Sequence, residues 1–243
     1  MKQTRGFTLI EMAIVLVIVT ILIGGLVMPL SAQIQARRIA ETNRTLEEAR
    51  DAILGYAMTH RAGSPLTANR HLPCPDTDLP PDGVQNRSNN SVCDAPVGRL
   101  PWVDLGVAPQ DAWGNRLLYA VLDEFSERST GFNQSSPGLP VNPFEISSVY
   151  NIGSPDVAAN VVFVIASHGP NGWGAQSIAG TTLARPSGPD EAENLDGNKR
   201  FVSRSPTKAD TVNGEFDDLL VWVSHPQLIH HICPTGSDCS AAP

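Results

Sequence analysis

The sequence contains few charged residues and no basic stretch. Charged residues make up 17% of its 243 positions, and 25 acidic residues outnumber 17 basic ones, so the formal net charge is −8. Proteins that bind nucleic acid usually concentrate Lys and Arg on one face or along one segment. We therefore expect no nucleic-acid partner.

Recognisable catalytic patterns are also missing. The sequence has no Gly-x-Ser-x-Gly nucleophile elbow and no phosphate-binding loop. His60, His71 and His168 have no neighbouring pattern of base or nucleophile, and Ser167-His168 before a Gly-Pro pair is typical of an ordinary turn after a strand. We expect no enzymatic activity.

Glycine and proline, by contrast, are plentiful, with 20 of each. Proline exceeds its usual share of about 5%, which indicates many turns. The length allows one domain of ordinary size beside an N-terminal helix.

One long apolar run, residues 7–30, dominates the N-terminal segment and contains a single carboxylate, Glu11. About 20 apolar residues can span a bilayer, whereas a secretory signal peptide has an apolar core of only about 7–15 residues. A plain membrane anchor fits the length but leaves Glu11 unexplained, because an acidic side chain at the bilayer centre costs roughly 2.5–3.5 kcal/mol. A buried core helix would be shorter and less uniform. If the chain were cut after Gly6, the new amine of Phe7 would lie one helical turn from Glu11 and could pair with it.

This segment resembles the leader and N-terminal helix of type IV pilins and type II secretion pseudopilins. The resemblance rests on the basic Lys2 and Arg5, followed by Gly6, the sequence Phe-Thr-Leu-Ile-Glu at residues 7–11, and about twenty apolar residues. It implies that a membrane-embedded peptidase cuts after Gly6 and methylates the new N-terminus.

The same resemblance assigns roles to three further positions. Phe7 would be the methylated residue, and Glu11 would help to set the register of subunits during assembly. Pro29 would be the proline that kinks the helix late in the apolar segment.

From Gln33 to about Arg61 the pattern is that of an amphipathic helix. Its stripe recurs at spacings of three, four or seven and consists of Ala36, Ile39, Asn43, Leu46, Ile53 and Ala57, with only Asn43 polar. The expected organisation is a leader at 1–6, a transmembrane and assembly helix at 7–30, its amphipathic continuation at 31–61 and a globular domain at 62–243.

Three apolar segments of the remaining chain are expected to be strands: residues 117–122, 161–165 and 219–223. The second is rich in β-branched residues and is predicted to be buried on both faces. Residues 169–198 form a long excursion rich in Gly, Pro and Ser. The expected fold is therefore α+β, with a long N-terminal helix followed by a small antiparallel sheet with large loops.

The cysteines fall into two local pairs, Cys74/Cys93 and Cys233/Cys239. Four cysteines allow three connectivities, of which we favour pairing between neighbours, and this would place the domain in an oxidising compartment. The second pair lies close to three histidines, His225, His230 and His231. Their spacing matches no common zinc template, so a small disulfide loop is favoured over a zinc site.

A second resemblance concerns the core of the major pseudopilins. It rests on Asp111-Ala112-Trp113-Gly114-Asn115 before one strand, on Ser167-x-Gly169 after another, and on Phe216-Asp217-Asp218 before a strand with tryptophan. In those proteins the loop between the last two strands is short and binds calcium, whereas this chain has about fifty residues there.

Asp217 and Asp218 are accordingly candidate calcium ligands, because adjacent carboxylates suit a hard cation. The alternative is that they cap or pair at the entry of a strand. Residues 190–197 do not match a calcium-binding EF-hand loop, but this turn could lend an oxygen to the same site. Calcium is the single candidate cofactor.

Together these patterns predict a structural subunit, a minor pilin or pseudopilin, of a type IV pilus or a type II secretion fibre. It would cross the bacterial inner membrane once, with its C-terminal domain in the periplasm. Its partners would be other subunits, the prepilin peptidase and the inner-membrane assembly platform. The alternative is a membrane-anchored periplasmic binding or adhesion domain that does not polymerise.

Overall fold

The computed structural model describes residues 7–63, 68–89 and 91–239, without the side chains of residues 24–29. The chain divides into two units, Met1–Ala40 and Glu41–Pro243. Gly6 and the side chain of Pro29 lie outside the described part of the chain, so the cleavage site and the kink stay predictions.

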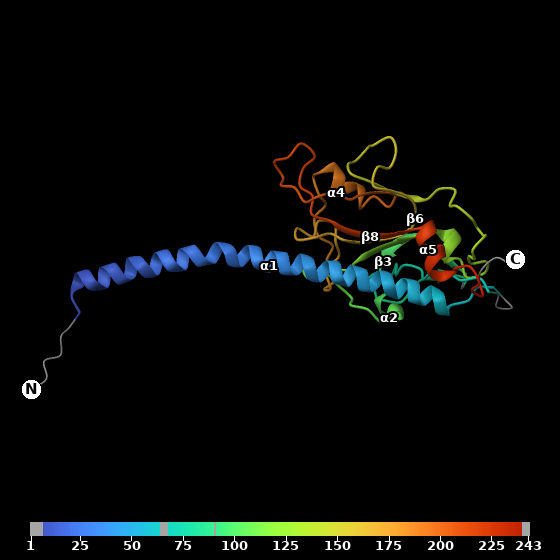
Figure 1. Ribbon diagram of the computed structural model, residues 1–243, viewed down its shortest axis with the longest axis horizontal. Helices are drawn as coiled ribbons and strands as arrows, with labels where there is room; N and C mark the ends of the chain where they lie inside the picture. Colours follow the sequence, from blue (N-terminus) through green and yellow to red (C-terminus); the bar gives the residue numbers. More distant parts are fainter. Residues whose placement is uncertain (1–6, 64–67, 90, 240–243) are drawn as a thin grey trace, which may run out of the picture. The chain divides into compact units, whose positions relative to one another are not determined.

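A single helix, α1 (Leu9–Thr59), contributes to both units (Figure 1). It ends two residues before the predicted Arg61, because the backbone after His60 pairs with other segments of the chain. The hydroxyl of Thr59 donates to the carbonyl oxygens of Gly55 (3.2 Å) and Tyr56 (3.1 Å), which are among the last acceptors of the helix. The backbone of Arg61 then pairs with that of Arg70 in an antiparallel bridge.

Among the described residues, no helix combines the length and the apolar character needed to cross a membrane. The predicted transmembrane segment, residues 7–30, includes residues 24–29, whose side chains are outside the described part. It stays a prediction.

The larger unit is built on a six-stranded sheet with the order β3-β4-β6-β5-β7, to which β8 is added beside β6. The strands are β3 (Val97–Arg99), β4 (Leu118–Val121), β5 (Phe144–Ser147), β6 (Ala158–Ser167), β7 (Arg200–Val202) and β8 (Leu219–Ser224). All three predicted strands are present, as β4, β6 and β8. As expected, β6 is buried throughout its apolar run, from Val161 to Ser167.

The expectation of an antiparallel sheet is right for every pair but one. β5 and β7 pair in parallel, with Glu145 opposite Arg200 and Ser147 opposite Val202. Parallel strands need a long connection, and the chain supplies one, because β6 and the excursion after it lie between them in sequence. β3, β5 and β7 were not predicted, because each is short and lacks the continuous apolar run that marks β4.

The second half of α1 supplies one wall of the hydrophobic core. Leu46, Ala49, Ile53 and Ala57 are fully buried in one cluster with residues of β4 and β6. The predicted stripe is wrong at Ala36, which is exposed, and at Asn43, which is exposed as well. Its neighbour Thr42 is buried instead, and its hydroxyl accepts a hydrogen bond of 3.2 Å from the amide of Ala112.

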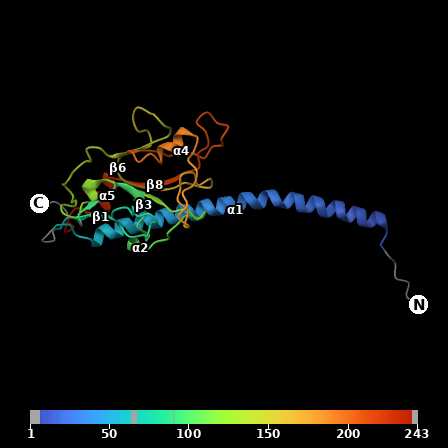
Figure 2. The same ribbon diagram turned by 180° about the vertical axis from the view of Figure 1, so that it is seen from behind.

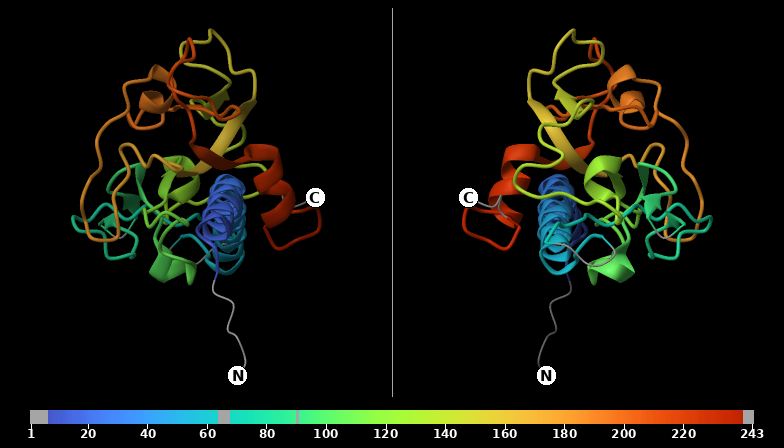
Figure 3. Two further views of the ribbon diagram at one scale, coloured as in Figure 1. Left: turned by 90° about the vertical axis from the view of Figure 1, so that its left-hand side faces the viewer. Right: turned by 90° about the vertical axis from the view of Figure 1, so that its right-hand side faces the viewer.

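In the described part of this unit, four short helices and a hairpin accompany the sheet. They are α2 (Trp102–Leu105), α3 (Asp123–Ser126), α4 (Pro189–Glu193), α5 (His225–Ile232) and the hairpin of β1 (Arg87–Ser88) with β2 (Val92–Cys93). α5 follows β8 directly and buries Leu228 and Ile232 in the core. Figure 2 places β1 and α5 near the end of α1, and Figure 3 shows α4 higher in the unit than the last turns of α1.

Both disulfides that the sequence favours are present, Cys74–Cys93 and Cys233–Cys239. The first joins the segment after residue 71 to β2, and the second closes a small loop after α5. All four cysteines of the chain are thereby paired.

We predict that the two disulfides differ in their contribution to stability. On the chain-entropy model a loop of 19 residues is worth about 3 kcal/mol and a loop of 6 about 2 kcal/mol. The double variant Cys74→Ala/Cys93→Ala should therefore lose more free energy of unfolding in denaturant titration than Cys233→Ala/Cys239→Ala. A larger loss from the second pair would contradict this ranking.

Candidate functional site

The first candidate site is the start of α1, where Thr8 and Glu11 bind each other. The amide and the hydroxyl of Thr8 donate to Glu11 Oε2 (3.3 and 3.4 Å), and the amide of Glu11 donates to Thr8 Oγ1 (3.3 Å). This reciprocal arrangement is a capping box, which satisfies amides at the beginning of a helix. Glu11 thus closes the first turn of α1, a role that the spacing Thr-x-x-Glu could have revealed.

The apolar side chains around Glu11 are exposed. Phe7 is 78% exposed, and Leu9 is 90% exposed. Among the side chains described in residues 7–38, none is buried. A continuous apolar surface of this kind indicates a membrane or protein contact.

The second candidate site is an acidic cluster in the larger unit, formed by Glu191 of α4 and by Asp217 and Asp218 before β8. Carboxylate oxygens of the three residues lie within 4.8 Å of one another. Glu191 is 1% exposed and Asp218 is 5% exposed. The structure therefore brings the two predicted ligands together with a third carboxylate from the turn at 190–197.

Neutral donors satisfy most oxygens of this cluster. Glu191 Oε1 accepts from the amide of Asp217 (2.9 Å) and from Asn171 Nδ2 (3.1 Å), and Asp218 Oδ2 accepts from Asn194 Nδ2 (2.7 Å). Asp217 Oδ2 accepts from the amide of Asn171 (3.1 Å), but Asp217 Oδ1 is buried without a hydrogen-bond partner. A buried carboxylate oxygen in that state lacks what a cation would supply.

The electrostatics of the cluster disfavour three charged carboxylates. Burial, and then repulsion from Glu191, raises the pKa of Asp217 to about 7. Burial and the charge of Asp218 likewise raise the pKa of Glu191. Each added negative charge weakens the others, so the cluster would gain from a bound positive charge.

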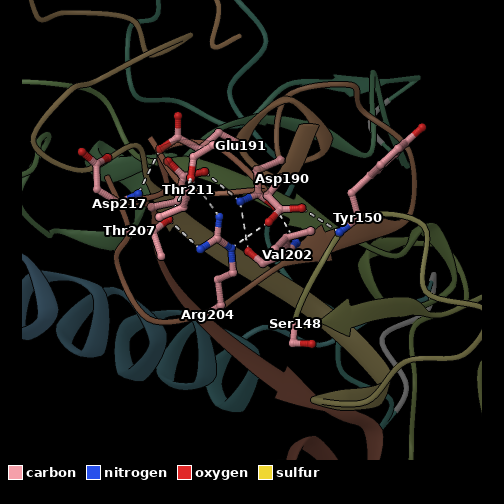
Figure 4. Close-up of polar contacts among 12 residues, drawn as sticks. Ser148, Tyr150, Asp190, Glu191, Val202, Arg204, Thr207, Thr211 and Asp217 are labelled. Carbon is pink, nitrogen blue, oxygen red and sulfur yellow. Dashed lines mark hydrogen bonds and ion pairs between the residues drawn. The ribbon is translucent and has the colours of Figure 1, made fainter. Parts of the chain in front are cut away.

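A buried ion pair holds α4 in position for this cluster. Arg204 Nε lies 2.7 Å from Asp190 Oδ2, and Asp190 Oδ1 accepts from the amide of Tyr150 (2.8 Å). Figure 4 shows the neighbouring carboxylates of α4 turned to different partners, Asp190 to Arg204 and Glu191 to Asp217.

Gly169, the last residue of the Ser167-x-Gly169 pattern, allows the segment before β8 to approach. Its φ is +57°, and a Cβ atom there would lie 2.2 Å from the carbonyl oxygen of Asp217. Only glycine tolerates both the conformation and the contact. The segment just before β8 therefore packs against the residues that directly follow β6.

Sequence reasoning missed two polar neighbours of the cluster, Asn171 and His168, whereas Asn194 belongs to the turn at 190–197 that it had singled out. His168 is 3% exposed, and its Nδ1 lies 3.5 Å from Asp218 Oδ1, so the supposed turn histidine lies beside the cluster. No local pattern connects these residues to Asp217, because up to 46 positions separate the hydrogen-bonded partners.

The residues of the zinc hypothesis are used otherwise. Cys233 and Cys239 are joined in a disulfide and cannot act as thiolate ligands. His225 packs edge-on against Phe125 with ring centres 5.6 Å apart, while His230 and His231 contact each other.

Comparison with known proteins locates one match. A family model of the prokaryotic N-terminal methylation motif matches residues 1–27, which include Gly6, Phe7 and Glu11. No curated protein and no solved structure matches the chain significantly. Residues 1–27 thus carry the prepilin-type signature that is found in type IV pilins and pseudopilins.

Proposed function

We propose that this protein is a structural subunit, a minor pilin or pseudopilin, of a type IV pilus or a type II secretion fibre. It is cut after Gly6, methylated at Phe7 and assembled through its N-terminal helix. The methylation motif at residues 1–27 carries the proposal. The role is one of assembly, not catalysis.

The exposed apolar surface of α1 supports this role. Large side chains such as Ile14, Leu16 and Ile21 are 55%, 65% and 68% exposed. Burial of apolar surface is worth roughly 25 cal/mol per Å², so such a helix is stabilised in a bilayer or among the helices of neighbouring subunits. In the proposed pathway it is inserted in the inner membrane and then transferred into the fibre by the assembly platform.

Glu11 is proposed to have a second partner in the fibre. In the capping box its carboxylate accepts hydrogen bonds from Thr8 through Oε2 alone. A carboxylate has two oxygens and can accept several bonds, so the pairing with Thr8 leaves capacity for an ammonium group. The amine created at Phe7 of a neighbouring subunit is the partner we propose, because both charges would otherwise be unpaired in apolar surroundings.

The large unit would then lie in the periplasm, as its two disulfides suggest. Disulfides persist in oxidising compartments such as the periplasm. An alternative with the same topology is a membrane-anchored binding or adhesion domain that does not polymerise.

We further propose that the acidic cluster of Glu191, Asp217 and Asp218 binds Ca²⁺. The supporting observations are the three converging carboxylates and the unpartnered Oδ1 of Asp217. Ca²⁺ takes six to eight oxygen ligands, so backbone carbonyls or water would complete the shell. The ion would tie the excursion after β6 to the start of β8.

The processing step separates the two proposed roles. Mass spectrometry of the protein from membranes should find an N-terminus at Phe7 that carries a methyl group. Loss of residues 1–6 together with methylation supports the fibre subunit. An intact Met1 in the membrane fraction would favour the non-polymerising anchor.

Charge at Glu11 should be required for assembly and not for processing. Glu11→Gln keeps a residue that can complete the capping box but removes the charge, so it should be inserted and cut normally. Its incorporation into fibres should fall about tenfold, which corresponds to about 1.4 kcal/mol. Thr20→Val, which removes another polar group of α1, is the matched control and should assemble normally. Wild-type incorporation of Glu11→Gln would overturn the pairing with Phe7.

Asp217 should make stability depend on pH and on calcium. Its pKa is raised from 3.8 to about 7 in the folded state, so its contribution is present below about pH 4 and is lost as the pH rises through 7. In chelator the melting temperature should therefore fall between pH 5 and pH 8. Added Ca²⁺ at pH 7.5 should raise it, by about 2–4 °C for each kcal/mol of binding energy.

The variant Asp217→Asn should flatten the pH dependence and reduce the response to Ca²⁺. Asp210→Asn, at an exposed position between β7 and β8, is the control and should behave as the wild type. A melting temperature that chelator leaves unchanged in the wild type would remove the calcium proposal. It would leave the fibre proposal intact.

A further inference from the structure

A cavity of about 570 Å³ lies where α1 ends, between its last turn, the β1 hairpin and the segment after α3. Its lining includes Tyr56, His60, Arg61, His71, Arg87 and Arg128. Among the residues that the structure describes, no aspartate or glutamate lines it, although acidic residues outnumber basic ones in the whole chain. The volume is in the usual range for small-ligand sites, about 300–1,000 Å³.

Arg87 brings a positive charge into this wall without a counterion. Its Nε donates to Gln85 Oε1 (2.9 Å), and its two Nη groups donate to the carbonyl oxygens of Ser91, Ser126 and Leu72. Every one of these acceptors is neutral. Among the described residues, no carboxylate forms an ion pair with Arg87.

The carboxylate that pairs with Arg61 of the lining is shared between two arginines. Asp238 lies 2.7 Å from Arg61 and 2.6 Å from Arg70, whose side chain is 8% exposed. One negative charge therefore balances two positive ones. This leaves an excess of positive charge at the rim as well as in the wall.

His71 is a buried neutral side chain in this wall. Burial, opposed by a hydrogen bond to the carbonyl of Leu72, lowers the pKa of His71 to about 4, and the charges of Arg87, His60 and Arg128 contribute in the same direction. His71 is therefore neutral at physiological pH. Its ring lies edge-on to Tyr56, with centres 5.7 Å apart.

Tyr56 adds an oriented donor. Its ring stacks on His60 with centres 3.7 Å apart, and its hydroxyl oxygen accepts a hydrogen bond of 2.9 Å from Gln85 Nε2. A phenol has one proton to donate. Because Gln85 donates to the hydroxyl oxygen and does not accept from it, the hydroxyl proton is available to a ligand in the cavity.

We propose that this cavity binds the oxyanion group, a phosphate or a carboxylate, of a small molecule. Arg128 and Arg61 would contact the anion, the hydroxyl of Tyr56 would donate to it, and Arg87 would hold the wall at positive potential. Guanidinium groups suit planar and tetrahedral oxyanions because they donate in a fixed fork. The site is independent of fibre assembly and of the acidic cluster.

The test is isothermal titration of the full-length protein in neutral detergent, in a buffer without phosphate and at constant ionic strength. The two probes are inorganic phosphate and citrate. At least one of them should bind at a single saturable site with a Kd of about 1 mM or tighter. Binding of phosphate alone identifies a phosphate ligand, and binding of citrate alone identifies a carboxylate ligand.

Three variants locate the binding. Arg128→Gln should raise the Kd about tenfold, and Tyr56→Phe, which removes one hydroxyl, about threefold. Arg44→Gln changes the net charge equally on the exposed face of α1, where its side chain is 82% exposed, and should leave the Kd unchanged. If Arg128→Gln is unstable, Tyr56→Phe decides.

Two results would overturn the proposal. One is that neither probe saturates. The other is that Arg44→Gln weakens binding as much as the cavity variants do, because the attraction would then be that of diffuse surface charge.

Discussion

Strand β6 is the element on which the rest of the larger unit depends. Its backbone pairs with β4 and β5 along one edge and with β8 along the other. Residues Val161–Ser167 are buried on both faces, so a shift of register would expose or misplace every side chain. At its end, Ser167 Oγ donates to Asp111 Oδ2 (2.7 Å), which fastens the turn before β4. The acidic cluster forms where the chain leaves β6 and where it returns to β8.

One helix serves two environments because its side chains change along its length. In α1 the described residues up to Arg38 are exposed, whereas Leu46, Ala49, Ile53 and Ala57 are fully buried. The apolar surface of the first part has to be buried elsewhere, and the capping box at Thr8 and Glu11 determines where that part of the helix begins. The second part is held in place by its contacts with the hydrophobic core of the larger unit. The assembly that we propose for the first part would therefore leave the core contacts of the second part in place.

Charge is segregated inside the larger unit. The acidic cluster gathers around Glu191 and Asp217, while the cavity at the end of α1 gathers arginines around Tyr56. These groups belong to different elements, as Figure 1 lets the reader follow from α4 to the end of α1. In each place buried charge of one sign remains incompletely balanced. Buried charge without a counterion costs free energy of folding. This cost is the physical ground for proposing a cation at one site and an oxyanion at the other.

Several features could be derived from the sequence because they depend on short-range pattern. The apolar run with Glu11, the amphipathic continuation that was predicted to about Arg61 and ends at Thr59, and the strands β4, β6 and β8 follow from hydrophobic period and composition. The spacing of the cysteines favoured the two disulfides that are present but left other connectivities open. Asp217 and Asp218 could be singled out for the same reason, since they are adjacent in the chain.

Tertiary structure alone decided the partners. Glu191 is 26 residues from Asp217 in sequence. The parallel pairing of β5 with β7 joins residues more than fifty positions apart. Arg87 donates to the carbonyl oxygen of Leu72, which precedes it in the chain, and to that of Ser126, which follows it. These contacts depend on where a long, turn-rich excursion comes to rest. That position is determined by many weak contacts acting together, such as the close approach at Gly169 and the ion pair of Arg204 with Asp190. No local sequence pattern predicts the combined effect of these contacts.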